Sequence, residues 1–234
     1  MTDVPARRPQ VPNVATGGPA GGPAARPVAV VDESPADAAA LAAYARVSIA
    51  FVVREVLACT PVRGGLGGLA LAPRAVERPY VKDYDAVDGG PSGWITRFGA
   101  AAVARWGVLA AYAGGAQAGT RVGGAVVVHA DPAVDLLGGR RDLAVLWDLR
   151  VAPSYRGAGV GRALFAAAGA WARARGARRL EVETQNVNAP ACRFYARQAC
   201  VLGAAHRFAY PELPDEVQLL WYLDLADGGA TGTA

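Results

Sequence analysis

Hydrophobic and polar positions show no regular period at the start of the chain. Residues 1–33 are rich in proline, glycine and alanine, so we predict that this arm is disordered. Residues 34–46 then follow a helical pattern. Ser34 is placed to cap this helix, Pro35 suits its first turn, and Asp37 has the spacing of a capping box.

The next segments combine one strand-like run with a long irregular stretch. The β-branched residues from Val47 to Leu57 predict a strand. Residues 60–93 are repeatedly interrupted by glycine and proline, so we expect an irregular region that contains at most a short helix.

From Trp94 onward the pattern becomes clearer. Three apolar runs predict strands, and they are followed by a helix with one apolar face that ends near Gly176. A further strand, a helix capped by Asn188 and two last strands complete the pattern. The predicted strands cover residues 105–113, 120–130, 143–152, 178–184, 200–210 and 217–225, and the two helices cover residues 159–177 and 188–198.

The order of these elements predicts the fold class. Strands first run together and then alternate with helices, which indicates an α/β (α+β) domain with a mixed sheet. We expect this single domain to span residues 34–226, with a flexible tail over 227–234.

Composition narrows the class of protein. The chain has 234 residues, of which 53% are hydrophobic, and no apolar run is long enough for a membrane span. The first residues lack the apolar core of a secretory signal. Cys59, Cys192 and Cys200 form neither a paired framework nor a metal-ligand spacing, so we expect a cytoplasmic protein without a bound metal.

Basic residues concentrate in one segment although the net charge is only +4. Seven arginines and no acid lie between Arg150 and Arg179, around a glycine-rich loop. Aromatic residues for base stacking are not interleaved with these arginines, which argues against nucleic acid. We therefore expect an anionic small ligand and neither a nucleic-acid nor a membrane partner.

The glycine-rich loop, "YRGAGVGRAL", lies between a strand and a helix. A P-loop would need a lysine there, but the only lysine in the chain is Lys82. A dinucleotide fingerprint would need a third glycine where Arg162 stands. What remains is Arg156-x-x-Gly159-x-Gly161, whose free amides at a helix N-terminus, with two arginines, would bind phosphate.

This pattern resembles the signature of the GNAT acyltransferase superfamily, R/Q-x-x-G-x-G/A, whose ligand is the pyrophosphate of acetyl-coenzyme A. The second half of the family pattern is also present, as Asn188, Ala191 and Tyr195 in "NVNAPACRFYAR". The resemblance implies a central, mostly antiparallel sheet of about six to seven strands flanked by helices. The residues that it assigns to acetyl-coenzyme A are Leu149, Arg150, Val151, Arg156, Gly157, Ala158, Gly159, Val160, Gly161, Arg162, Asn188, Ala191 and Tyr195.

Longer stretches are similar to streptothricin (nourseothricin) acetyltransferases, which acetylate an amine of the β-lysine moiety. These stretches are "ERPYVKDYD", "LWDLRVAPSYRGAGVGRAL", "LEVETQNVNAPACRFY" and "EVQLLWYLDL". Two positions depart from this pattern: Trp147 replaces a glutamate, and Ala199–Cys200 replaces the usual Gly-Phe.

The resemblance also implies catalytic roles. Tyr195 would be the general acid that protonates the departing thiolate. Asp148 and Glu183 would accept the amine proton or bind the positive charge of the substrate. The substrate-binding candidates are Asp148, Glu183, Tyr84 and Trp147.

Other functions stay open at this point. The acceptor could be another small amine, or a lysine or N-terminus of a protein. Alternatively, the chain could sense acyl-coenzyme A without catalysis. Dimers are frequent in the family, so the resemblance also allows a homodimer.

Overall fold

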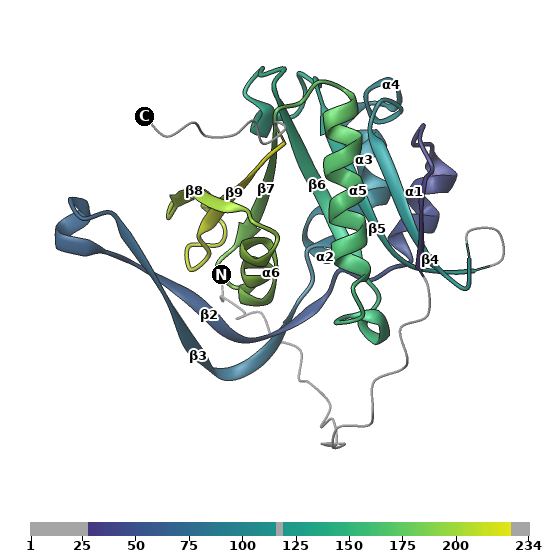
Figure 1. Ribbon diagram of the computed structural model, residues 1–234. Coiled ribbons are helices and arrows are strands. Elements are labelled where there is room, and N and C mark those ends of the chain that lie inside the picture. The colour runs from purple at the N-terminus through teal and green to yellow at the C-terminus, as the bar shows by residue number, and fades with distance from the viewer. Residues whose placement is uncertain (1–27, 116–118, 226–234) are drawn as a thin grey trace, which may run out of the picture.

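Seven strands form one mixed sheet that runs through the domain (Figure 1). The computed structural model describes residues 28–115 and 119–225. The strand order is β1-β4-β5-β6-β7-β9-β8, and all neighbours are antiparallel except β6 and β7. This confirms the predicted fold class. The strands are β1 (Val28–Asp32), β4 (Gly107–Ala113), β5 (Thr120–His129), β6 (Leu143–Val151), β7 (Arg179–Gln185), β8 (Val201–His206) and β9 (Gln218–Asp224).

Helices cover both faces of this sheet (Figure 1). One core layer contains Leu164 and Phe165 of the long helix together with Tyr195 of the last helix. The other layer contains Tyr44 and Trp94 from the first half of the chain. The helices are α1 (Ala38–Ala45), α2 (Asp85–Asp88), α3 (Gly90–Phe98), α4 (Ala100–Val103), α5 (Val160–Ala174) and α6 (Ala189–Arg197).

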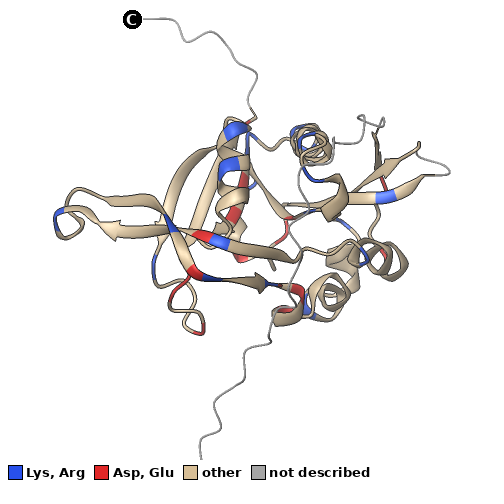
Figure 2. Cartoon of the chain, turned by 90° about the horizontal axis from the view of Figure 1, so that it is seen from below, with Lys and Arg blue, Asp and Glu red and all other residues tan. Residues whose placement is uncertain are grey.

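A two-stranded arm projects from the domain between α1 and α2 (Figure 1). It consists of β2 (Phe51–Pro61) and β3 (Leu69–Lys82), which pair only with each other. Both acidic and basic positions lie where the arm joins the rest of the domain (Figure 2). The prediction of an irregular region over residues 60–93 was therefore wrong, because most of this stretch is strand and helix.

Two further predictions near the start of the chain need correction. Residues 28–32 are not disordered, since they form β1 and pair with β4 at the edge of the sheet. Asp37 rather than Ser34 caps α1, because its side chain accepts a 2.7 Å hydrogen bond from the Ala40 N–H. The remainder of the predicted arm, residues 1–27, and the predicted tail lie outside the described residues.

The strands and helices predicted after residue 105 are confirmed, except that the strand predicted over residues 200–210 ends at His206. Val160, Leu164, Ala168 and Trp171 of α5 are all buried, as their helical spacing predicted. Gly176 follows this helix with φ +87°, the left-handed conformation typical of a helix end. Periodicity was decisive here because each of these elements packs one face against a large core.

β6 contains an irregularity that decides where its side chains point. The register with β5 shifts between Leu146 and Asp148, so Trp147 is an extra residue in a β-bulge. Leu146 belongs to the core layer under α5, whereas Trp147 packs on the opposite layer and Asp148 bonds Tyr44 there. Two consecutive side chains therefore face α1 and α3.

The end of α6 has the geometry of a Schellman motif. The Cys200 N–H donates to the Tyr195 carbonyl (3.1 Å), and the Ala199 N–H donates to the Ala196 carbonyl (3.3 Å). Ala199 accordingly takes φ +63°, which favours glycine. The sequence departure at this position therefore places a strained residue next to the helix that carries Tyr195.

We predict that Ala199→Gly increases the free energy of unfolding by about 1 kcal/mol, because glycine adopts this conformation without a clash at its Cβ. Denaturant unfolding of the two proteins measures the difference. Ala196→Gly, placed inside the same helix, is the control and should destabilise by about 1 kcal/mol. Equal losses for both variants would contradict the strain at Ala199.

Candidate active site

The glycine-rich loop joins the end of β6 to α5 and turns at two glycines. After a 3-10 turn at Pro153–Tyr155, Gly157 and Gly159 take φ of +80° and +85°. No atom of the described residues lies within 4 Å of the position that a Cβ would take at Gly157. A bound molecule can therefore approach this backbone closely.

The first turn of α5 presents N–H groups that the protein leaves without partners. The helix has neither a side-chain cap nor an acidic residue in its first turn. Free donors and the helix dipole together favour an anion at this position. Among the described residues, no acceptor bonds the N–H groups of Gly157, Gly159, Val160, Gly161 or Arg162, whereas the Ala158 N–H donates to the Tyr155 carbonyl (3.3 Å).

The two predicted phosphate arginines have different surroundings. Arg162 is exposed, and its Nη2 lies 3.9 Å from the position of a Cβ at Gly159, so its guanidinium lies over the loop. Arg156 instead donates through Nε to the Val151 carbonyl and through Nη2 to the Ala50 carbonyl, both at 3.0 Å. Arg156 thus holds the loop in place, and Arg162 is the better placed of the two to contact an anion.

The loop, β6 and α6 meet at Gly161. A Cβ at this glycine would lie 3.5 Å from the Phe194 ring and 3.7 Å from a Val151 methyl group. The start of α5 therefore contacts both the end of β6 and the helix that carries Tyr195.

The edge of β6 that faces this meeting point has no strand beside it. Pairing with β7 extends from Leu143 to Leu146 and stops there (Figure 1). The Ala152 N–H donates to the Val122 carbonyl in β5. Because backbone directions alternate along a strand, the N–H groups of Leu149 and Val151 point to the open edge, and that of Arg150 points to β5.

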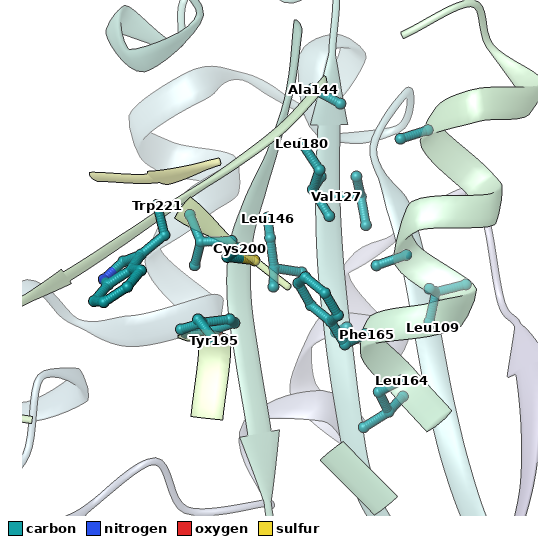
Figure 3. Packing of buried hydrophobic residues seen from close by; sticks show 14 of the residues in the cluster. Leu109, Val127, Ala144, Leu146, Leu164, Phe165, Leu180, Tyr195, Cys200 and Trp221 are labelled. Atoms are coloured by element: carbon teal, nitrogen blue, oxygen red, sulfur yellow. The ribbon is translucent and has the colours of Figure 1, made fainter. Parts of the chain in front are cut away.

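α6 brings the second half of the predicted motif to the same edge. Asn188 caps the helix, since its side chain accepts from the Ala191 N–H at 3.2 Å. Tyr195 is only 5% exposed and lies among buried side chains that include Leu146, Phe165 and Cys200 (Figure 3). Its ring packs at 5.6 Å from that of Phe165.

The surroundings of Tyr195 keep its phenol protonated. Burial raises the pKa of Tyr195 well above its ordinary value, and the negative charge of Asp148 raises it further. Asp148, on the opposite face of β6, is therefore close enough to Tyr195 to act on it electrostatically. No described residue forms a hydrogen bond to this hydroxyl.

Asp148 lies in a buried cluster on the opposite face of β6. Its carboxylate is ion-paired with Arg150 and accepts a 2.9 Å hydrogen bond from the Tyr44 hydroxyl. Arg150 also pairs with Asp85 (2.8 Å) and donates to the Val47 carbonyl (3.1 Å). Burial raises the pKa of Asp148, and the Arg150 charge opposes the shift.

This cluster corrects one predicted ligand of the coenzyme. The Arg150 side chain is fully buried and points away from the open edge, and its N–H faces β5. Leu149 and Val151 keep the predicted direction, whereas Arg150 serves to join β6 to α1 and α2. The bulge at Trp147 is the physical reason, because it shifts the alternation by one residue.

Trp147 contributes to an aromatic wall on this face. Its ring is in contact with those of Trp94, Phe98 and Trp106, with centroid distances of 5.3 to 6.4 Å. The ring is half-buried, so part of it remains accessible. Trp147 thus gives this face of β6 an apolar surface.

Glu183 lies on β7 just beyond the last residue paired with β6. Its carboxylate accepts hydrogen bonds from the Tyr210 hydroxyl, from Gln185 Nε2 (3.1 Å) and from Gln218 Nε2 (2.9 Å). All three donors are neutral. No ion pair to Glu183 occurs within the part of the chain that the structure describes.

A second carboxylate, Glu216, is close enough to Tyr210, a hydrogen-bond donor to Glu183, to act on it electrostatically. It is buried, forms an ion pair with Lys82 and accepts a 3.0 Å hydrogen bond from the Tyr84 hydroxyl. Burial and the charge of Glu216 raise the pKa of Tyr84. The predicted substrate residues Glu183 and Tyr84 thus lie in one polar cluster.

Sequence reasoning missed several residues of this cluster, among them Tyr210 and Glu216. Both lie between β8 and β9, because β8 ends at His206 and the strand predicted over residues 200–210 was too long to show Tyr210 in a connecting segment. It also missed Asn186, whose side chain donates to the Leu57 carbonyl (3.1 Å) and accepts from the Val217 N–H (2.8 Å). Asn186 therefore ties the arm to the sheet, and its place in "TQNVNAP" between β7 and α6 was the available signal.

A groove of about 490 Å³ lies between the arm and the segment after β7. Its lining includes Arg74, Glu77 and Tyr80 of β3 together with Asn186 and Asp215. It offers both charged and apolar surface next to the Glu216 cluster.

Two classes of feature are not found in the described ranges. They contain no group of three or more His, Cys, Asp or Glu side chains that could hold a metal ion. None of the helices in those ranges is long and apolar enough to cross a membrane. The Cys192 and Cys200 thiols are buried, and burial raises the pKa of Cys200 to about 11.

Known proteins share parts of this arrangement. Streptothricin acetyltransferase A of Bacillus subtilis (strain 168) is 38% identical over 81 residues, which cover 34% of the chain and 47% of the relative. The chain thus spans about half the length of this curated relative. A crystal structure of nourseothricin acetyltransferase superposes with a TM-score of 0.62 at 27% identity, covering 85% of the chain and 98% of the other.

A second structure shows the same fold. A Bacillus anthracis str. Ames protein in complex with acetyl coenzyme A superposes with a TM-score of 0.62 at 22% identity, covering 85% of the chain and 99% of the other. The Acetyltransferase (GNAT) family model matches residues 81–199. Because this match spans more than half of the 234 residues and contains the glycine loop, β6, β7 and α6, the chain belongs to the GNAT acetyltransferase family.

Proposed function

We propose that the protein is an acetyl-coenzyme A-dependent N-acetyltransferase that acts on a primary amine of a cationic small molecule. The proposed acceptor is the β-lysine amine of streptothricin-type antibiotics, whose acetylation would give resistance by inactivation. One observation carries the proposal: an anion-binding loop, an open strand edge and a buried tyrosine meet where β6 and β7 separate. The names of the relatives, streptothricin and nourseothricin acetyltransferase, support the choice of acceptor.

The residues present fit acetyl-coenzyme A. The unpaired N–H groups at the start of α5 and the Arg162 guanidinium suit a diphosphate. The Leu149 and Val151 N–H groups at the open edge would bond the pantetheine amides and the thioester carbonyl. When bound, acetyl-coenzyme A supplies an activated acyl group and a thiolate leaving group.

Tyr195 is the proposed general acid. It carries the one hydroxyl side chain of α6, and its raised pKa keeps it protonated at the pH at which the amine reacts. The negative charge of Asp148 favours the protonated phenol. Asp148 itself exchanges no proton in this proposal. The phenol thus holds the proton that the departing thiolate needs.

Glu183 is the better placed of the two carboxylates to accept the amine proton. An alkyl amine is mostly protonated near neutral pH and must lose a proton before it attacks. Asp148 is engaged by Arg150 and Tyr44, whereas Glu183 is held only by neutral donors at the end of the paired part of β7. We therefore assign the base to Glu183 and a positioning role to Asp148.

The surroundings of Glu183 suit a cationic acceptor. The carboxylates of Glu183 and Glu216 lie among tyrosine hydroxyls, and Trp147 adds an aromatic surface on the same face. Carboxylates and aromatic faces both attract an ammonium group. The groove beside the arm gives room for the part of the acceptor that does not react.

The proposal is tested by thiol release from acetyl-coenzyme A with streptothricin as acceptor. We expect turnover by the wild-type protein and a loss of at least tenfold in kcat for Tyr195→Phe, with coenzyme binding nearly unchanged, because only the acidic proton is removed. A panel of small amines and peptides serves as the comparison. Coenzyme binding without turnover on any acceptor would instead identify a sensor.

We predict that Gly159→Ala weakens acetyl-coenzyme A binding at least tenfold, because the added Cβ strains the left-handed turn and displaces its N–H groups. Isothermal titration calorimetry measures the affinity. Gly176→Ala is the matched control, since Gly176 has φ +87° at the other end of α5. If both variants bind the coenzyme like the wild-type protein, the loop does not hold the diphosphate.

We predict that Glu183→Gln lowers kcat about 100-fold while the affinity for acetyl-coenzyme A stays the same, because the amide cannot accept the amine proton. Steady-state kinetics and calorimetry measure the two effects. Glu181→Gln is the control: Glu181 lies on the same face of β7 and bonds Tyr222, within the part still paired with β6. Similar losses in both variants would rule out a specific role for Glu183.

A further inference from the structure

Four polar groups connect β9, β7 and α6 just beyond the point where β6 and β7 separate. The Trp221 indole N–H donates to the Thr184 hydroxyl (2.9 Å), which lies 3.4 Å from the Cys192 sulfur. This sulfur lies 3.8 Å from the Gln185 carbonyl oxygen. Thr184 and Cys192 are only 4% and 1% exposed. The four groups, which we call the Thr184 network, therefore bond to one another inside the core.

The chemistry of the two ends fixes the direction of every bond in the network. An indole nitrogen can only donate and a carbonyl oxygen can only accept. The Thr184 hydroxyl therefore accepts from Trp221 and gives its hydrogen to Cys192, and the thiol donates to the Gln185 carbonyl. Burial raises the pKa of the Cys192 thiol, so it keeps the hydrogen that the last bond needs.

The network lies where backbone pairing holds β7 on one edge only. Pairing with β6 ends at Val182, whereas pairing with β9 continues to Gln185. Thr184 thus belongs to the part of β7 whose other edge is open. A fully satisfied buried network allows one arrangement of its elements, whereas apolar packing alone tolerates small shifts. The network therefore fixes α6 against the part of β7 that β6 does not support.

Both proposed catalytic groups are close in the chain to members of this network. Cys192 precedes Tyr195 by three residues, so the two side chains lie on one face of α6, and both belong to the core cluster shown in Figure 3. At the other end, the Gln185 side-chain amide donates to the Glu183 carboxylate (3.1 Å). The network thus joins the helix of the proposed acid to the residue that holds the proposed base.

We propose that Thr184 is a positioning residue for acetyl transfer. Through Cys192 and Gln185 it sets how α6, with Tyr195, lies relative to Glu183. Acid and base must both reach the reacting atoms, so a small shift between them lowers kcat. The loop at the start of α5 is not part of the network, so the affinity for the coenzyme stays the same. This inference rests on the proposed function, because it names the residue that positions the two catalytic groups of that function.

The test separates the hydroxyl of Thr184 from its contribution to packing. Thr184→Val keeps the shape and leaves the Trp221 N–H without an acceptor. Thr184→Ser keeps the hydroxyl and is the conservative variant. Val182→Ala is the matched control for lost stability, because Val182 is buried on the same face of β7 and has no polar side-chain group. Denaturant unfolding, calorimetry with acetyl-coenzyme A and steady-state kinetics with streptothricin are measured for each protein.

We expect Thr184→Val to lower kcat by at least about fivefold, with the KM and affinity for acetyl-coenzyme A unchanged, because the acid and the base are no longer held in place. Thr184→Ser and Val182→Ala should keep most of the wild-type kcat. Cys192→Ala breaks the same network from the helix and repeats the test if Thr184→Val fails to fold. A smaller loss in the variants that break the network, or an equal loss in Val182→Ala, overturns the proposal.

Amide hydrogen exchange keeps this idea separate from the proposed acceptor. If the wild-type protein fails to turn over streptothricin, the proposed acceptor is wrong, and exchange in the coenzyme-free proteins then tests Thr184 alone. Faster exchange over α6 relative to α5 in Thr184→Val, without this change in Val182→Ala, supports the positioning role. The same exchange pattern in both variants overturns it.

Discussion

The separation of two parallel strands is the constraint on which the rest of the site depends. β6 and β7 pair only as far as Leu146 and Val182, and both then continue without each other. A buried strand edge with unpaired N–H and C=O groups costs free energy, so such an edge needs a partner. Acetyl-coenzyme A is a suitable partner because its pantetheine arm carries amides of its own. The glycine loop, α6 and Glu183 all lie around this edge.

A buried charge cluster holds the other side of the opening in place. Arg150 bridges Asp85 and Asp148 just after the bulge, and Tyr44 completes the contacts. Such a cluster adds little net stability, but loss of one member leaves an uncompensated buried charge, which costs several kcal/mol. The cluster fixes the positions of these elements, because it joins β6 to α1 and to α2, the helix that follows the arm. The end of the arm, with Lys82 and Tyr84, leads directly into this helix.

The sequence predicted the parts of the site that are local and lie against a large core. The glycine loop and the Asn188–Tyr195 motif each occupy one short segment, and strong apolar periods identified the elements around them. The arm could not be predicted in this way, because β3 is exposed over most of its length and contains Pro73 and Pro79. β2 buries Val53 and Val56 against Val187, whereas β3 has no fully buried side chain, so its sequence shows no alternation.

The acceptor cluster could not be predicted for a different reason. Glu183 was identified from its strand, but Tyr210 lies beyond the end of β8 and Glu216 lies just before β9, and the contacts of both are long-range ones made by the tertiary fold. The sequence also did not predict which face of the sheet the Arg150 side chain lies on, because the bulge at Trp147 reverses the alternation of β6. Irregular backbone and long-range contacts leave no periodic signal in one sequence.

The division of charge across the sheet suggests how the two substrates meet. The unpaired donors and Arg162 lie at the start of α5, whereas Glu183 and Glu216 lie on the face opposite to α5 and α6. A polyanionic coenzyme and a cationic acceptor would therefore bind from opposite faces and meet at the strand opening. Both thiols near Tyr195 are buried and have raised pKa values, so neither suits a covalent acyl carrier. Direct attack of the amine within a ternary complex is the mechanism that this geometry favours.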